Sequence, residues 1–342
     1  MVTENLTLGL VLVLLGGLLQ GSFMLPMKYT REWKWENVWL VFSATAYLIL
    51  PWLIAYLTVP RLGDVLSGTS SRTLVQTIAL GLGWGVGALT FGLGVDYLGL
   101  ALGFAIILGL TAAIGTLVPL LVLSPESLGG TPGLMILIGI AIIIAGISVC
   151  SWAGNLKEQA LAGGGRSVTG NEPRSYALGL LFCILSGILS PFGNLGFAFG
   201  SEVSEVALAM GTSEHYAANP LWALLTLPLF FCNAGFSLYL LSRSGAFSRF
   251  STAPAHYYLL AASMGAMWIG GMATYGSGAN KLGEAGASVG WAILMSSMVI
   301  FANLWGVLTG EWAGAGKKPL RVMGLGVFLL IIAIFVIGFS RA

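Results

Sequence analysis

Charged residues are scarce in this sequence, and their scarcity decides the class of protein. Asp, Glu, Lys and Arg make up only 8% of the 342 residues, whereas a soluble domain carries about 25%. Hydrophobic residues make up 57%, and the mean hydropathy is +0.91. A soluble monomer is therefore excluded, and we expect an integral protein of a lipid bilayer. The formal net charge of +2 gives no reason to expect a nucleic-acid partner.

Residues that usually carry catalysis or bind metals are also few. The two histidines, His215 and His256, lie at the edges of apolar segments, and no paired His–Glu metal motif or phosphate-binding loop is present. Cys150, Cys183 and Cys232 all fall in apolar surroundings, which is typical of small buried residues rather than disulfides or metal ligands. We therefore expect no enzyme activity, no metal and no cofactor.

Long apolar runs dominate what the sequence does contain. Most are near the roughly 20 residues that a helix needs to cross hydrocarbon. The ten runs cover about 6–27, 37–58, 74–94, 98–123, 133–152, 176–199, 218–242, 257–279, 285–309 and 320–340. We therefore predict an all-α integral membrane protein with ten transmembrane helices. The acidic segment 200–217 alternates glutamates with apolar residues and is typical of a short amphipathic helix at the membrane surface.

The residues 81–99 recur in altered form at 265–283. Eight of the 19 positions are identical at an offset of 184, and a weaker echo relates the first and sixth apolar runs at an offset of 170. The identical pairs include Trp84/Trp268, Gly92/Gly276 and Gly94/Gly278. Glycines inside spans permit close helix packing or bending, so these four glycines are candidates for packing or hinge positions.

Ten spans in two similar halves place five spans in each half. Because five is odd, the second half must enter the membrane from the opposite side, which predicts two inverted five-helix repeats. The repeats would cover residues 1–152 and 175–342, joined by a polar cytoplasmic linker at 153–174. Halves of this kind are typical of secondary transporters, which rock around a site at the interface between their repeats.

The basic residues predict the orientation. Of the 15 Lys and Arg residues, 11 fall on the side of the linker and 4 on the other side. Basic residues accumulate in short cytoplasmic loops. The linker side is therefore expected to be cytoplasmic, with both chain termini in the periplasm or exterior.

The polar residues expected at membrane depth are mostly uncharged, and aromatic rings accompany them. Amides and ring faces suit a neutral sugar, whereas an organic anion would call for a buried Arg or Lys and a drug cation for a deep carboxylate. The candidate sugar-binding residues are Gln20, Trp84, Asn194, Trp268, Tyr275 and Trp291.

Several short motifs carry a resemblance to a known family. They are LPMK at 25–28, W-x-W-E-N-V-W at 33–39, LPW at 50–52, YLG at 97–99, GTL at 115–117, AGNLKE at 153–158, MW at 267–268 and G-E-W-A-G-A-G-K-K-P at 310–319. The chain resembles the L-rhamnose–proton symporter family of the drug/metabolite transporter superfamily. The resemblance implies a bacterial inner-membrane carrier that takes up L-rhamnose or a similar 6-deoxyhexose with protons. It also implies a central cavity lined by the first, third, fourth, sixth, eighth and ninth spans.

Proton coupling, which rests on this resemblance, requires a carboxylate that changes its surroundings during transport. The candidates lie near the ends of spans: Glu284, Asp96 and Glu36. Glu284 is the first choice because it begins a cavity-lining span on the side where protons arrive.

Two other classes of function stay open. An exporter of amino acids or other small metabolites would have the same architecture. A membrane sensor or a lipid-modifying enzyme is disfavoured, because a sensor should carry an output domain outside the membrane and an enzyme should show a cluster of titratable residues.

Overall fold

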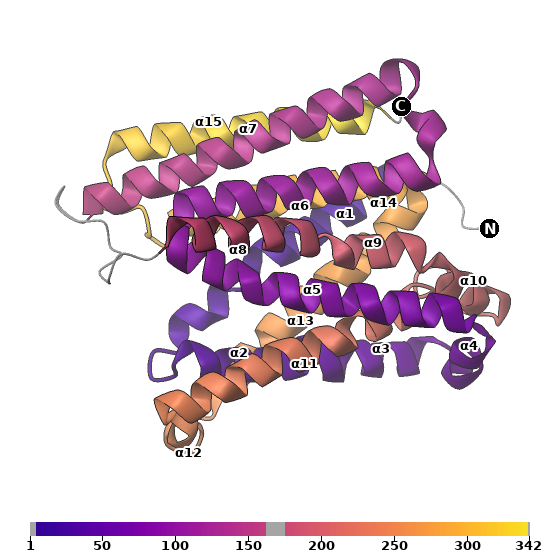
Figure 1. Cartoon of the computed structure of the whole chain (residues 1–342), viewed down its shortest axis with the longest axis horizontal. Helices are drawn as coiled ribbons and strands as arrows, with labels where there is room; N and C mark the ends of the chain where they lie inside the picture. Colours follow the sequence, from indigo (N-terminus) through magenta and orange to yellow (C-terminus); the bar gives the residue numbers. More distant parts are fainter. Residues whose placement is uncertain (1–4, 162–174, 341–342) are drawn as a thin grey trace.

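The computed structural model describes residues 5–161 and 175–340, and the regular structure in these residues is helical. The long helices run side by side in a bundle (Figure 1). The start of α1 and the end of α15 lie at one end of the bundle, which we name the terminal end. The end of α7 and the start of α8 lie at the opposite end, which we name the linker end.

Most long segments consist of a single helix, but the first, second and sixth are interrupted. The first half contains α1 (Leu6–Ser22) with η1 (Leu25–Tyr29), α2 (Trp35–Ser43) with the π-helical η2 (Ala44–Ile49) and α3 (Leu50–Thr58), α5 (Ser71–Leu98), α6 (Leu100–Leu123) and α7 (Gly130–Leu161). The second half contains α8 (Tyr176–Leu189) with α9 (Phe192–Phe199) and α10 (Ser201–Ala209), α11 (Asn219–Ser244), α13 (His256–Lys281), α14 (Gly286–Leu308) and α15 (Lys317–Phe339). Short helices cover the ends of the bundle: α4 (Leu62–Gly68), η3 (Pro125–Leu128), η4 (Ala246–Ser248) and α12 (Arg249–Thr252).

Nine segments of the described chain are long and apolar enough to cross a membrane. The tenth expected span, 257–279, corresponds to α13, a continuous helix of 26 residues that is not among those nine. Its glycines, tyrosines and tryptophan lower its hydropathy. Because Met264, Ile269 and Met272 are buried inside the bundle, this helix meets protein rather than lipid along much of its surface.

The last helix of the first half is longer than the apolar run 133–152. Helix α7 continues to Leu161, nine residues beyond the expected end at 152, because the polar residues after 152 still form helical turns at the linker end. The remaining expected linker residues, 162–174, lie outside the described residues. The expected amphipathic helix in 200–217 corresponds to α10, which buries Val203 and Ala207.

Glycines bring the central helices close together. Helix α1 packs along α13, and α8 packs along α5. In the first contact, a Cβ atom on Gly9 would lie 2.7 Å from the side chain of Leu282. In the second, a Cβ atom on Gly179 would lie 2.8 Å from the side chain of Leu98. Small residues at these positions allow the backbones to approach, which is the usual basis of helix packing in membranes.

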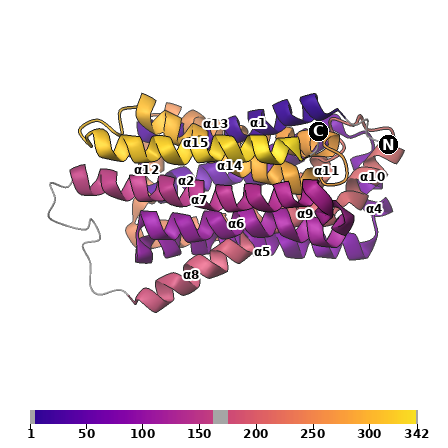
Figure 2. The same ribbon diagram turned by 90° about the horizontal axis from the view of Figure 1, so that it is seen from above.

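Helices α7 and α15 lie side by side at one edge of the bundle (Figure 2). Their contact also depends on glycine, since a Cβ atom on Gly146 would lie 2.9 Å from the side chain of Leu330.

Candidate functional site

The two tryptophans of the repeated sequence meet in the middle of the bundle. The rings of Trp84 on α5 and Trp268 on α13 lie 5.5 Å apart between centroids. Tyr47 approaches Trp268 edge-on, with a centroid distance of 4.7 Å. Gln20 on α1 is buried and donates a hydrogen bond from Nε2 to the backbone oxygen of Trp268 at 2.7 Å. The structure thus brings together three of the predicted sugar-binding residues, Gln20, Trp84 and Trp268.

Two other predicted residues, Asn194 and Tyr275, form a separate buried network nearer the terminal end. Asn194 Nδ2 donates to the backbone oxygens of Gly115, at 2.8 Å, and Ala287, at 3.1 Å. The Tyr275 hydroxyl donates to Asn194 Oδ1 at 2.5 Å and lies 3.1 Å from the oxygen of Ala287. Both side chains are fully buried. Their hydrogen-bonding groups are therefore occupied by protein in this conformation.

Trp291 extends this network between α14 and α6. Its Nε1 donates to the backbone oxygen of Thr111 at 3.1 Å, and the indole occupies the space where Gly115 lacks a side chain. The network therefore ties α6, α9, α13 and α14 together in the terminal half of the bundle.

The paired glycines Gly92 and Gly276 have different surroundings. A Cβ atom on Gly276 would lie 2.7 Å from Nε1 of Trp222 and 3.2 Å from the ring of Phe197. A Cβ atom on Gly92 would have no neighbour within 4 Å in the described part of the chain. Helix α13 is therefore tightly packed beside Gly276, in its terminal half. Helix α5 has open space beside the equivalent Gly92, in its linker half.

The other glycine pair, Gly94 and Gly278, has similar surroundings in both copies. A Cβ atom on Gly94 would lie 2.7 Å from Cys183 Sγ on α8, and one on Gly278 would lie 2.9 Å from Val13 on α1. Both glycines therefore mediate helix contacts. A hinge role for any of the four glycines stays a prediction.

The three candidate proton-coupling carboxylates are far from equal in burial. Glu284 and Asp96 are exposed. Glu36 is only 8% exposed and is the one carboxylate in the buried class among the residues that the structure describes. Its Oε1 accepts a hydrogen bond from Ser244 Oγ at 2.5 Å, which joins the start of α2 to the end of α11.

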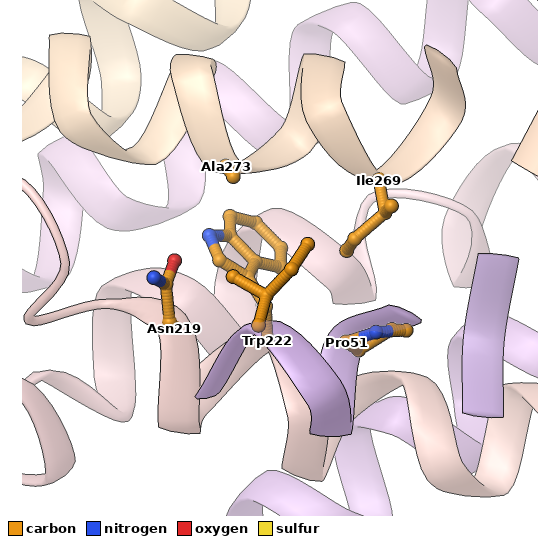
Figure 3. A pocket seen from close by; sticks show the side chains of 6 residues that line it. Pro51, Asn219, Trp222, Ile269 and Ala273 are labelled. Carbon is orange, nitrogen blue, oxygen red and sulfur yellow. The ribbon is translucent and has the colours of Figure 1, made fainter. Parts of the chain in front are cut away.

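A small cavity lies between α3, α11 and α13 (Figure 3). It is lined by Pro51, Ile54, Asn219, Trp222, Ile269 and Ala273. Its volume of about 10 Å³ gives room for about one water molecule, so it is not a sugar site. Trp222 Nε1 is buried there without a hydrogen-bond partner among the described residues.

Comparison with known proteins identifies the family. A protein-family model described as L-rhamnose-proton symport protein (RhaT) matches residues 2–342. The chain belongs to the L-rhamnose–proton symporter family. It is 30% identical to the L-rhamnose-proton symporter of Yersinia pestis (strain Pestoides F) over 345 residues, covering 98% of both chains. It is 29% identical to that of Cronobacter sakazakii (strain ATCC BAA-894) over 350 residues, covering 99% of both. Family membership confirms a multi-pass membrane transporter rather than an enzyme.

Two motifs that carry the symporter resemblance meet at the linker end. Lys28 of the LPMK motif forms an ion pair with Glu311 of the G-E-W-A-G-A-G-K-K-P motif and donates to Thr309 Oγ1 at 2.6 Å. Lys157, from AGNLKE, lies 3.8 Å from the same carboxylate and 5.0 Å from the ring centroid of Trp312. Sequence reasoning missed this network, although the presence of all three charges in family motifs was an available signal.

Polar contacts at the terminal end were also missed. Glu202 on α10 accepts hydrogen bonds from Ser70 and Thr73 at the start of α5. Lys281, only 6% exposed, lies 3.2 Å from Glu214. The alternation of glutamates with apolar residues in 200–217 was a signal for a surface helix but not for these partners.

Proposed function

We propose that this chain takes up L-rhamnose or a closely related deoxysugar together with protons, by alternating access, across a bacterial inner membrane. The observation that carries the proposal is the end-to-end match to the symporter family, from residue 2 to residue 342. The symporters of Yersinia and Cronobacter match over nearly their whole length, which supports the same activity for this chain.

We propose ten crossings in two inverted repeats. Gly9 contacts Leu282, and Gly179 contacts Leu98. Gly9 corresponds to Gly179 at an offset of 170, and Leu98 corresponds to Leu282 at an offset of 184. The contact of α1 with the end of α13 therefore corresponds to the contact of α8 with the end of α5. A two-fold axis that relates the halves would produce this correspondence. The same relation makes α13 the counterpart of α5, which supports counting α13 as the tenth span.

We propose that the terminal end faces the outside. The bias of 11 Lys and Arg residues to 4 supports a cytoplasmic linker end. With that orientation, the network of Asn194, Tyr275 and Trp291 closes the outer side, and the open surroundings of Gly92 lie on the cytoplasmic side. The conformation is then outward-closed.

The central tryptophan pair is the best supported place for the sugar. The indole faces of Trp84 and Trp268 can cover the C–H face and methyl group of a deoxysugar, as aromatic rings do with apolar surfaces. The Gln20 amide, held by its bond to the backbone of Trp268, has its oxygen left for a sugar hydroxyl. Asn194 and Tyr275 exchange their mutual hydrogen bonds for the sugar or for water when the outer side opens.

Among the candidate carboxylates, Glu36 is better supported than Glu284 as the coupling residue. A coupling carboxylate must exchange its surroundings between states. Glu36 is already buried and bonded across the two halves in this state. Its place at the linker end puts it where protons leave the carrier in the proposed orientation.

Uptake by purified protein in proteoliposomes tests the proposal. With an inward proton gradient, we expect accumulation of radiolabelled L-rhamnose, alkalinisation of the external medium on sugar addition, and loss of accumulation with a protonophore. A panel of other monosaccharides and amino acids defines the substrate. Counterflow of amino acids without any response to sugars would favour the exporter and reject sugar uptake.

A further inference from the structure

The connection between α9 and α11 covers the terminal end of the bundle. It consists of α10, which ends the sixth long segment, and the loop 210–218. One face of α10 is seated on the bundle, since Val203 and Ala207 are fully buried, whereas Glu205 is exposed. The offset between the halves grows from 170 to 184 across this connection, which gives the second half 14 residues that the first half lacks. The linker end therefore has no equivalent of this segment in the repeat.

A carboxylate fastens the segment to the opposite half. Glu202 Oε1 accepts from the backbone nitrogen of Ser70 at 2.8 Å, and Oε2 accepts from Ser70 Oγ at 2.7 Å and from Thr73 Oγ1. These donors lie at the N-terminal end of the 28-residue helix α5. The helix dipole and the charge on the acceptor both strengthen such bonds. Glu202 thus joins α10 to the helix that carries Trp84.

An ion pair and two neutral contacts hold the rest of the segment. Lys281 on α13, only 6% exposed, lies 3.2 Å from Glu214 in the loop. Ser277 Oγ on α13 donates to the backbone oxygen of His215 at 2.9 Å, and directly after the loop Asn219 Nδ2, at the start of α11, donates to Thr58 Oγ1 on α3 at 2.9 Å. The segment therefore touches helices of both halves, and any widening of the terminal end must break some of these contacts.

A polar side chain lies beneath the segment. Thr77, six residues into α5, is only 1% exposed, and its hydroxyl has no hydrogen-bond partner among the described residues. It faces the junction of α9 and α10, where a Cβ atom on Gly200 would lie 3.1 Å from Thr77 Oγ1. A cysteine at this position would therefore report whether water enters under α10.

We propose that α10 and the loop 210–218 form a lid over the outer entrance of the sugar pathway, and that Glu202 is its latch. Glu202 is a positioning residue, which acts through α5 and not through contact with the sugar. This inference rests on the proposed alternating access and adds the element that must lift for sugar to enter.

Thiol labelling tests the latch without sugar or protons. The three native cysteines are replaced by alanine, and Thr77→Cys is added as a reporter of similar size. Right-side-out membrane vesicles are treated with a membrane-impermeant maleimide, and the labelling rate is measured. Glu202→Gln keeps the size of the side chain but removes its charge, and it places an amide donor among the donors of Ser70 and Thr73. We expect labelling to become about tenfold faster or more, since a hydrogen bond to a charged group contributes at least that factor.

The neighbouring Glu205→Gln is the matched control, because it removes the same charge from the exposed face of the same helix. It should label at the parent rate. Thr73→Val removes one donor from the other side of the latch and should accelerate labelling less than Glu202→Gln, and it decides the question if Glu202→Gln does not fold.

Two outcomes separate failure of the lid from failure of the proposed function. Parent-like labelling in folded Glu202→Gln and Thr73→Val, with full labelling after denaturation, would overturn the latch. Acceleration seen only in inside-out vesicles would keep the latch but reverse the proposed orientation.

Discussion

At the scale of single residues, Gln20 provides the sharpest test of the sugar site. Its amide is buried beside the Trp84–Trp268 pair. Gln20→Ala should weaken sugar binding by about 1–3 kcal/mol, roughly 5- to 150-fold, because a sugar hydroxyl loses its partner. Stabilisation of the detergent-solubilised protein by L-rhamnose would measure this loss. Gln20→Met keeps most of the volume and should lose as much affinity, whereas unchanged affinity in both variants would remove Gln20 from the site.

The carboxylates at the ends of the spans separate coupling from binding. Glu36→Gln keeps an acceptor for Ser244 but cannot release a proton, so we expect loss of concentrative uptake with sugar exchange retained. Glu284→Gln, at an exposed position, should leave both activities unchanged. Alkalinisation on sugar addition would report the coupling directly. If it persisted in Glu36→Gln and vanished in Glu284→Gln, the coupling role would return to Glu284.

At the scale of helices, the glycine contacts between α1 and α13 limit side-chain size. A Cβ atom on Gly9 would meet Leu282 at 2.7 Å, so Gly9→Val should lower stability by about 1–3 kcal/mol through overpacking. The melting temperature in detergent measures the effect, and adding Leu282→Ala should restore part of it. Gly92→Ala is the control: with no neighbour within 4 Å in the described chain, it should be neutral or stabilising, as alanine favours a helix.

Ten spans were predicted, and in the described part of the chain nine segments are long and apolar enough to cross a membrane. Apolar runs of this length leave few alternatives to a helix. Trp84 and Trp268 were both among the predicted sugar-binding residues, and the structure places their rings 5.5 Å apart between centroids. The locking of Asn194 by Tyr275, Gly115 and Ala287 could not be predicted. These partners are distant in the sequence. Whether the amide forms hydrogen bonds with protein groups or with a ligand depends on how the helices pack.

At the scale of the whole molecule, the crossing of α13 can be tested apart from the orientation. Ser251 precedes this helix and Glu284 follows it, and both are exposed. If α13 spans the membrane, Ser251→Cys and Glu284→Cys in the cysteine-free protein should react with an impermeant maleimide from opposite sides. Reaction of both from one side would reduce the count to nine spans.

Reporter fusions at the two ends of the chain test the orientation itself. We expect both termini outside, because most Lys and Arg residues lie at the linker end. Alkaline phosphatase, which is active only outside the cytoplasm, should be active at both termini, and green fluorescent protein should be dark. The reverse pattern would place the lid of α10 on the cytoplasmic side.

The difference between the two ends of this molecule can change the rates of transport but not its equilibrium. The connection that holds the 14 added residues lies at one end only, so the empty carrier can rest in one conformation and open to the two sides at different rates. Microscopic reversibility nevertheless requires that, with no gradient across the membrane, inward and outward fluxes of sugar balance at equal concentrations. The shape of the protein therefore sets how quickly sugar crosses and on which side the carrier waits. The limit to which sugar is concentrated depends on the gradient to which its movement is coupled and on the number of protons moved per sugar.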